Sequence, residues 1–208
     1  MVTERQTVAV LGAGNIGSKL GRKWITRGHQ VVFGVSDPKG KNAQRLRSDL
    51  GEKAVIGSVT DALSRNPEIV VMAVPATAMD TIVPTYAKQL DGRIIIDVTN
   101  RMGSQTMNSF ELLREQLPDA LLFRAFNTYG GVNLENPQFA QSVATLFFCG
   151  SDGDARAKVE QLITDVGPEP AYIGGVEQVN VVDGVTQLWF ALVFGQKRGQ
   201  HLAFKILE

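Results

Sequence analysis

The stretch that decides the fold is residues 8–17, which read VAVLGAGNIG. Its first four residues are apolar and predict a buried strand, because short Val-rich runs that end at a glycine are typical of strands. Three glycines follow at the spacing G-x-G-x-x-G, and Ile16, Leu20 and Trp24 then recur at intervals of four. That interval places their side chains on one face of a helix, which Arg27 and Gly28 would end. The order of strand, glycine turn and helix predicts the first unit of a parallel α/β fold.

Each glycine of the turn has its own steric role. Gly12 permits the sharp bend, Gly14 lets an anion approach the backbone, and Gly17 lets helix and strand pack closely. The free amides at the start of the helix would then bind the diphosphate of a dinucleotide. The alternative is a glycine-rich turn that binds nothing, but the flanking strand and helix favour the dinucleotide site. Its predicted residues in the turn are Gly12, Ala13, Gly14, Asn15, Ile16 and Gly17.

Strands and helices alternate along most of the chain. Apolar runs without polar alternation are typical of parallel strands covered on both faces. Such runs occur at residues 31–33, 54–56, 69–74 and 94–96, and further strands are predicted at 121–125, 144–149 and 171–173. Helices are predicted over residues 77–89, 110–117 and 155–166, the first capped by the T-x-x-D pair Thr77 and Asp80. We therefore expect a Rossmann-type, doubly wound and mostly parallel sheet that binds its ligand at the carboxyl ends of the strands.

The last part of the chain is predicted to be an apolar helix. Val185, Leu188, Trp189, Leu192 and Val193 form one helical stripe, and Phe190 and Phe194 add apolar surface on other faces. Such a helix packs either on the sheet of its own chain or across a two-fold axis on a second copy. We favour a homodimer. The expected division is a nucleotide-binding domain over residues 1–175 and a C-terminal helical segment over residues 176–208, with a role in dimerisation.

Composition narrows the class of protein. The 208 residues are 44% hydrophobic and 20% charged, as in a folded domain. Lys plus Arg and Asp plus Glu both number 21, so no basic excess points to a nucleic-acid partner. The opening apolar run is too short for a signal peptide or a membrane span, which argues against a membrane association. Cys149 is the single cysteine, so we expect neither a disulfide nor a metal site, and a cytoplasmic location.

The end of the second predicted strand bears on the choice of dinucleotide. An NAD-preferring protein places a carboxylate there to bind the adenosine ribose, but the strand ends Phe33-Gly34-Val35. A hydroxyl and two cations follow that could bind a 2′-phosphate, which favours NADP(H). Asp37 lies in the same loop, and the lysines could equally belong to a solvated turn. The predicted residues here are Val35, Ser36, Lys39 and Lys41.

Three more polar or small-residue clusters follow strands, at residues 73–76, 97–100 and 126–131. All fall on the ligand side of the expected sheet, where backbone and small side chains could border a flat ring. The alternative is that they are ordinary turns, since Asn, Asp, Thr and Gly favour loops on their own account. The residues predicted to border the cofactor rings are Ala73, Val74, Pro75, Ala76, Thr99, Asn127 and Thr128.

No side chain is nominated as an acid, base or nucleophile. His29 and His201 are the two histidines of the chain. His29 precedes its strand, at the edge opposite the expected cleft, and is interpreted as a surface turn residue. His201 is interpreted as a residue of the C-terminal helix that faces solvent or a second subunit. Hydride transfer needs no such group, because the cofactor carries the chemistry.

Taken together, these segments resemble the family of NADP oxidoreductases that depend on the deazaflavin coenzyme F420. The similarity covers nearly the whole chain and rests on GAGNIG, HQVVFG, AVPATA, IIIDVTN and RAFNTYGG, followed by FFCGSDGDA. The chain is also similar to the nucleotide-binding domain of ferric reductases, which carries an AFNT-type segment.

The resemblance implies that the glycine turn holds the pyrophosphate and that the ring sites lie near Val74-Pro75 and Asn127-Thr128. It also implies a Ser-Arg pair for the 2′-phosphate, but Val35-Ser36 stand in its place. Arg101 follows Asn100 where a proline is common. The expected function is NADP(H)-dependent hydride transfer to a small flat acceptor such as coenzyme F420 or a flavin, with a quinone-like compound or an imine as alternatives. The alternative is a redox-sensing protein that binds NADPH without turnover.

Overall fold

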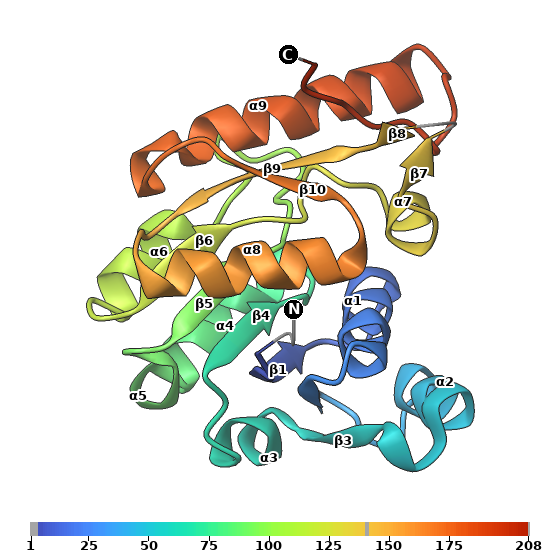
Figure 1. Cartoon of the computed structure of the whole chain (residues 1–208). Coiled ribbons are helices and arrows are strands. Elements are labelled where there is room, and N and C mark those ends of the chain that lie inside the picture. Colours follow the sequence, from blue (N-terminus) through green and yellow to red (C-terminus); the bar gives the residue numbers. More distant parts are fainter. Residues whose placement is uncertain (1–3, 140–141, 208) are drawn as a thin grey trace.

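A computed structural model describes residues 4–139 and 142–207 (Figure 1). An eight-stranded sheet runs through its centre in the order β10-β9-β6-β5-β4-β1-β2-β3. Its strands are β1 (Thr7–Leu11), β2 (Gln30–Val35), β3 (Val55–Ser58), β4 (Ile69–Met72), β5 (Ile94–Asp97), β6 (Leu121–Arg124), β9 (Thr145–Gly150) and β10 (Glu169–Tyr172). A separate hairpin consists of β7 (Gln138–Phe139) and β8 (Ser142–Val143). The predicted Rossmann-type sheet is confirmed.

Two apolar layers cover the sheet. One face packs against α1 (Asn15–Thr26), α2 (Lys41–Leu50) and α8 (Asp154–Val166). The other packs against α3 (Val59–Ser64), α4 (Met79–Thr85), α5 (Ala87–Leu90), α6 (Phe110–Gln116) and α9 (Val179–Phe190). The short helix α7 (Gly131–Glu135) follows β6 and lies near α1. The buried Trp24 anchors the first layer, since its Nε1 donates to the carbonyl of Leu162 over 2.9 Å.

The strand direction changes once within the sheet. Strands β1 to β6 are parallel, whereas β9 is antiparallel to β6, and β10 is parallel to β9. Among the residues that the structure describes between β6 and β9, the secondary structure consists of α7 and the small hairpin. No crossover helix carries the chain back across the sheet there, so β9 starts from the edge at which β6 ends.

The helix predicted over residues 77–89 differs from the structure. Residues Ala76–Ala78 form a 3-10 turn, α4 begins at Met79, and no side chain caps it. The predicted cap by Thr77 and Asp80 is therefore wrong. The carboxylate of Asp80 pairs instead with Arg101. The helix also breaks before α5, at Tyr86, two residues after Pro84, a residue type that disfavours a continuous helix.

Both histidines lie in places that the sequence did not indicate. His29 is buried: its Nδ1 accepts from the backbone N–H of Gln6 over 3.1 Å, and its Nε2 lies 2.8 Å from Oδ2 of Asp165. The interpretation as a surface turn residue is wrong, because the C-terminal end of α8 covers it. His201 is exposed, but it follows the end of the helical segment at Gly195 and stacks on Phe139 instead.

Helix α9 lies along β9 (Figure 1) and continues into a π-helical turn, Ala191–Gly195. Of the predicted apolar stripe, Trp189 and Val193 are buried, but Leu188 is 50% exposed. The buried face also includes Asp183 and Thr186. The apolar pattern alone could not show this, because the buried polar groups that receive these side chains come from distant parts of the chain. None of the described helices has the length and apolar character that crossing a bilayer requires.

Candidate functional site

A cleft of about 930 Å³ opens at the carboxyl ends of β1, β2 and β4. Three segments that contain predicted site residues border it: the glycine turn after β1, the loop after β2, and the exit of β4. The predicted site residues that line it are Gly12, Ala13, Gly14, Val35, Ser36, Lys41, Ala73, Val74 and Pro75. Three segments that are separate in sequence therefore meet in one concave surface.

Two glycines of the turn are required by the fold itself. Gly12 has a φ of +105°, and a Cβ there would lie 2.3 Å from the carbonyl oxygen of Ala73. A Cβ on Gly17 would lie 2.3 Å from the carbonyl oxygen of Gly12. Both positions exclude larger residues because backbone atoms already occupy the space. They hold β1, α1 and the exit of β4 close together.

Gly14 is different, because no residue that the structure describes occupies the space beside it. A Cβ on Gly14 would have none of their heavy atoms within 4 Å. Gly14 is the N-cap residue of α1 and provides no capping side chain. The first backbone bond into this end of the helix runs from the N–H of Ser18 to the carbonyl of Gly14. The preceding amides and the positive end of the helix dipole form an open cradle that fits a diphosphate.

The loop after β2 contributes groups of both signs. Ser36 and Lys41, the first residue of α2, line the cleft, and so does Asp37. Lys39 does not line it; its backbone N–H donates to Oδ1 of Asp37 over 2.9 Å and closes the turn. The carboxylate of Asp37 and the ammonium of Lys41 therefore offset each other's charge at this end of the cleft.

The opposite wall comes from α4 and α5 and was not predicted. Thr81, Ile82, Thr85 and Tyr86 line the cleft across from the β2 loop. Tyr86 Oη lies 3.3 Å from Oγ1 of Thr60, which ties this wall to α3. The signal in the sequence was helical spacing, since residues 81, 82 and 85 share one face of the helix that follows the AVPA exit.

The remaining predicted residues lie outside the lining of this cleft. Asn15 borders a smaller adjoining recess, and Ile16 packs against the core. Ala76 lies in the turn beyond Pro75. Thr99, Asn127 and Thr128 are buried at the ends of β5 and β6. Oδ1 of Asn127 and Oγ1 of Thr128 have no hydrogen-bond partner among the described residues.

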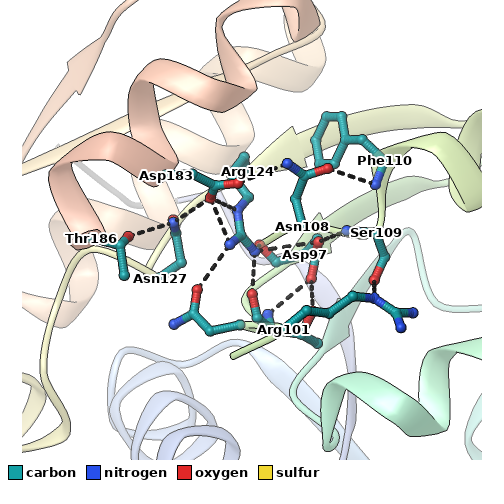
Figure 2. Close-up of polar contacts among 11 residues, drawn as sticks. Asp97, Arg101, Asn108, Ser109, Phe110, Arg124, Asn127, Asp183 and Thr186 are labelled. Atoms are coloured by element: carbon teal, nitrogen blue, oxygen red, sulfur yellow. Dashed lines mark hydrogen bonds and ion pairs between the residues drawn. The ribbon is translucent and has the colours of Figure 1, made fainter. Parts of the chain in front are cut away.

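Behind the strand ends, a buried polar network surrounds Arg124 (Figure 2). Arg124 is the last residue of β6 and is fully buried. Its Nε donates to Oδ1 of Asp183 over 2.8 Å, and its Nη2 donates to Oδ1 of Asn100 over 2.9 Å. Its Nη1 donates to the carbonyl of Thr99 and lies 3.3 Å from Oδ2 of Asp97. One guanidinium thus neutralises part of the charge of two buried carboxylates.

The same network fixes several segments around the site (Figure 2). Asp97 accepts from the side chain of Thr99 over 2.7 Å and from the backbone N–H of Ser109 over 3.1 Å. Asp183 accepts from Nδ2 of Asn127 over 3.2 Å, and Asn127 also donates to Oγ1 of Thr186 over 2.8 Å. The loops after β5 and β6 are therefore attached to α9.

Two other side chains near the strand ends have structural explanations. Nη1 of Arg101 donates to Asp80 over 3.1 Å, and its Nε donates to Ser109 over 3.2 Å, so it joins the β5 loop to α4. The hydrogen bond from Arg101 holds the pKa of the Asp80 carboxyl below its usual value. Burial raises the pKa of the Cys149 thiol to about 12, so this thiol stays protonated and is a poor nucleophile.

Comparison with known proteins agrees with this geometry. Residues 7–101 match the family described as NADP oxidoreductase, coenzyme F420-dependent. The matched segment contains the glycine turn, the β2 loop, the β4 exit and the β5 loop. The resemblance inferred from the sequence is confirmed over this segment, and it relates the chain to NAD(P)-dependent oxidoreductases.

Among curated proteins, the glycerol-3-phosphate dehydrogenase [NAD(P)+] of Pseudomonas savastanoi is 24% identical over 163 residues. That match covers 74% of this chain and 47% of the enzyme, so the chain spans about half the length of this relative. A candidate F420-dependent NADP reductase from Arthrobacter sp. FB24 has a TM-score of 0.82 at 19% identity and covers 98% of this chain and 100% of its own. The imine reductase of Myxococcus stipitatus, solved with NAD+, has a TM-score of 0.66 at 17% identity, over 93% of this chain and 62% of its own.

Proposed function

Because residues 7–101 carry the pattern of the coenzyme F420-dependent NADP oxidoreductases, we propose that this chain binds NADP(H) in the 930 Å³ cleft and is an oxidoreductase. The observation that carries the proposal is the open cradle at Gly14, beside the free amides of α1. Gly12 and Gly17 are explained by the packing of the protein, whereas the space at Gly14 is not. A diphosphate is the group that fits this space best.

Different segments of the cleft would bind different parts of the nucleotide. The amides at the start of α1 would hold the pyrophosphate, and Ser36 and Lys41 would contact the adenosine ribose and its 2′-phosphate. Ile82 and Tyr86 supply apolar surface for the adenine on the opposite wall. The exit of β4 at Val74 and Pro75 would border the nicotinamide, where Pro75 offers no backbone N–H.

When bound, NADPH supplies a hydride, and we propose that it passes to a flat acceptor such as coenzyme F420 or a flavin. The titratable side chains of the cleft lining are Asp37, Lys41 and Tyr86, and all belong to the β2 loop or to the α4–α5 wall. None lies at the β4 exit, where the ring is expected. The protein's part there is to position two flat rings and exclude water, without an acid or base of its own.

The test is turnover of NADPH with a panel of acceptors. Coenzyme F420, FMN, FAD and riboflavin are each added to the unaltered protein with NADPH, and the loss of nicotinamide absorbance is followed. We expect oxidation with at least one of them, at a rate proportional to the protein concentration. Tight NADPH binding without turnover on any acceptor would contradict the proposal that the chain is an enzyme, and it would favour a redox-sensing protein.

We also propose that the outer face of α9 forms a homodimer. Val181, Leu188 and Phe194 are 55%, 50% and 58% exposed along this helix and the turn that follows it. Water contact with three large apolar side chains in one region is unfavourable, and a second copy would cover them.

Light scattering after size-exclusion chromatography is expected to give twice the chain mass for the unaltered protein and the chain mass for Leu188→Glu. Met102→Glu, at a side chain 66% exposed on another loop, is the control and should stay dimeric. A monomeric unaltered protein would contradict this proposal.

A further inference from the structure

A recess of about 260 Å³ adjoins the main cleft between α1 and α2. The two spaces share Ala13, Gly14 and Asn42 as lining residues, so an opening beside the glycine turn connects them. Helices α1 and α2 follow β1 and β2 on the same face of the sheet (Figure 1). The recess therefore lies close to the first turns of α2, from which Asn42 and Arg45 border it.

Three cations line this recess, and two of them have firm partners. Lys19 donates to the carbonyl of Gly131 over 2.9 Å and lies 3.2 Å from a carboxylate oxygen of Glu135. Its side chain is 15% exposed. Nη1 of Arg22 lies 3.1 Å from Oδ2 of Asp49. These contacts join α1 to α7 and α2, and they leave Lys19 and Arg22 little freedom to move.

Arg45 is the third cation and is held weakly. Within residues 4–139 and 142–207 the carboxylate that it reaches is the one that Arg22 already occupies, at 3.8 Å from Oδ2 of Asp49. Its side chain is 78% exposed. One carboxylate therefore serves two guanidinium groups, which leaves one positive charge without a counter-charge. An exposed pair at this distance contributes little to stability, so Arg45 is free to turn towards an anion.

We infer that Arg45 binds the 2′-phosphate of the nucleotide and so selects NADP(H) over NAD(H), an inference that rests on the function proposed above. The adenosine ribose of a Rossmann-type protein binds at the end of β2, which here means beside Ser36 and the first turn of α2. Arg45 lies one turn further into α2 and borders the recess that opens there. A guanidinium binds phosphate with two parallel hydrogen bonds, which neither lysine of the loop can do.

The charges that line the cleft at the end of β2 nearly cancel. Asp37 lines the same end of the cleft as Lys41, and its carboxylate repels a phosphate. Lys39 does not reach the lining, so Lys41 alone would only balance Asp37. Arg45, in the lining of the adjoining recess, adds a positive charge beside this end of the cleft and would favour a doubly charged 2′-phosphate over a ribose hydroxyl.

The experiment compares two probes that differ only in the 2′-phosphate, 2′,5′-ADP and 5′-AMP, by calorimetric titration. Arg45→Ala is expected to raise the Kd of 2′,5′-ADP by at least about tenfold, because the loss of even one of the two charge-assisted hydrogen bonds would have this effect. The Kd of 5′-AMP should change less than about twofold. Likewise, the Kd of NADPH should rise in this variant and the Kd of NADH should change little. Lys53→Ala removes the same charge just beyond the other end of α2, away from the recess, and should change neither.

Several results would overturn the inference. An unchanged Kd for 2′,5′-ADP in Arg45→Ala would show that Arg45 does not contact the 2′-phosphate. An equal loss for both probes would place Arg45 on the 5′-phosphate that they share, with no role in selection. In either case, tight NADPH binding by the unaltered protein would leave the proposed function intact. If the unaltered protein bound neither probe and no NADPH, the proposed function would fall together with this inference.

Discussion

Gly14→Val is expected to abolish NADPH binding while the protein still folds. A Cβ on Gly14 meets no protein atom within 4 Å, and φ and ψ of −73° and −166° are open to any residue. The valine side chain would instead fill the cradle at the start of α1 and keep a diphosphate from the amides. Loss of two charge-assisted hydrogen bonds, about 1.5–3 kcal/mol each, corresponds to a Kd at least about a hundredfold higher.

The measurement is fluorescence titration with NADPH, together with urea unfolding to confirm the fold. Valine is a poorer N-cap residue than glycine, so we expect a decrease of about 1 kcal/mol in the free energy of unfolding. Thr164→Val is the control, because it also places a valine at an exposed helix position, on α8, which borders neither the cleft nor the exposed face of α9. Unchanged affinity in Gly14→Val would show that the glycine turn is not the nucleotide site.

Arg124→Met is expected to lower the free energy of unfolding by about 3–5 kcal/mol. Methionine fills much of the same volume, but it leaves the carboxylates of Asp97 and Asp183 buried without their counter-charge. It also leaves the carbonyl of Thr99 and the amide oxygen of Asn100 without their donor. A loss of this size is a large part of the stability of an ordinary domain.

Urea unfolding of three variants separates the charge from the packing. Asp183→Asn preserves the shape of the side chain but replaces one carboxylate oxygen with an amide nitrogen. If that nitrogen faces Asn108, the Nδ2 of Asn108 loses its acceptor, so we expect a decrease of about 1–2 kcal/mol in the free energy of unfolding. Arg156→Met is the control, because its ion pairs with Asp152 and Glu160 are exposed and should matter far less. If Arg124→Met cost no more than Arg156→Met, the ion network would not stabilise the site as described.

Local patterns predicted the first half of the site well. The glycine turn and the apolar strands depend on neighbours within a few residues, so the order strand, turn and helix could be read directly from residues 8–28. Because the carboxyl ends of parallel strands meet at one edge, the prediction also brought the turn, the β2 loop and the AVPA exit together. The cleft lining confirms that these three segments meet.

Long-range pairing explains most of what the sequence did not predict. Arg124 and Asp183 are 59 residues apart, and His29 and Asp165 are 136 apart. Nothing near either residue in sequence indicates its partner. The direction of β9 is likewise not encoded in its apolar residues. The break after α4 was different, since Pro84 was visible in the sequence and signalled the end of that helix.

The most direct test of the central claim is a crystal structure of the protein with NADPH. We expect the pyrophosphate oxygens within hydrogen-bond distance of the amides of Asn15 and Ile16, and the nicotinamide beside Val74 and Pro75. A nucleotide bound elsewhere on the molecule, with the space beside Gly14 left to water, would contradict the account.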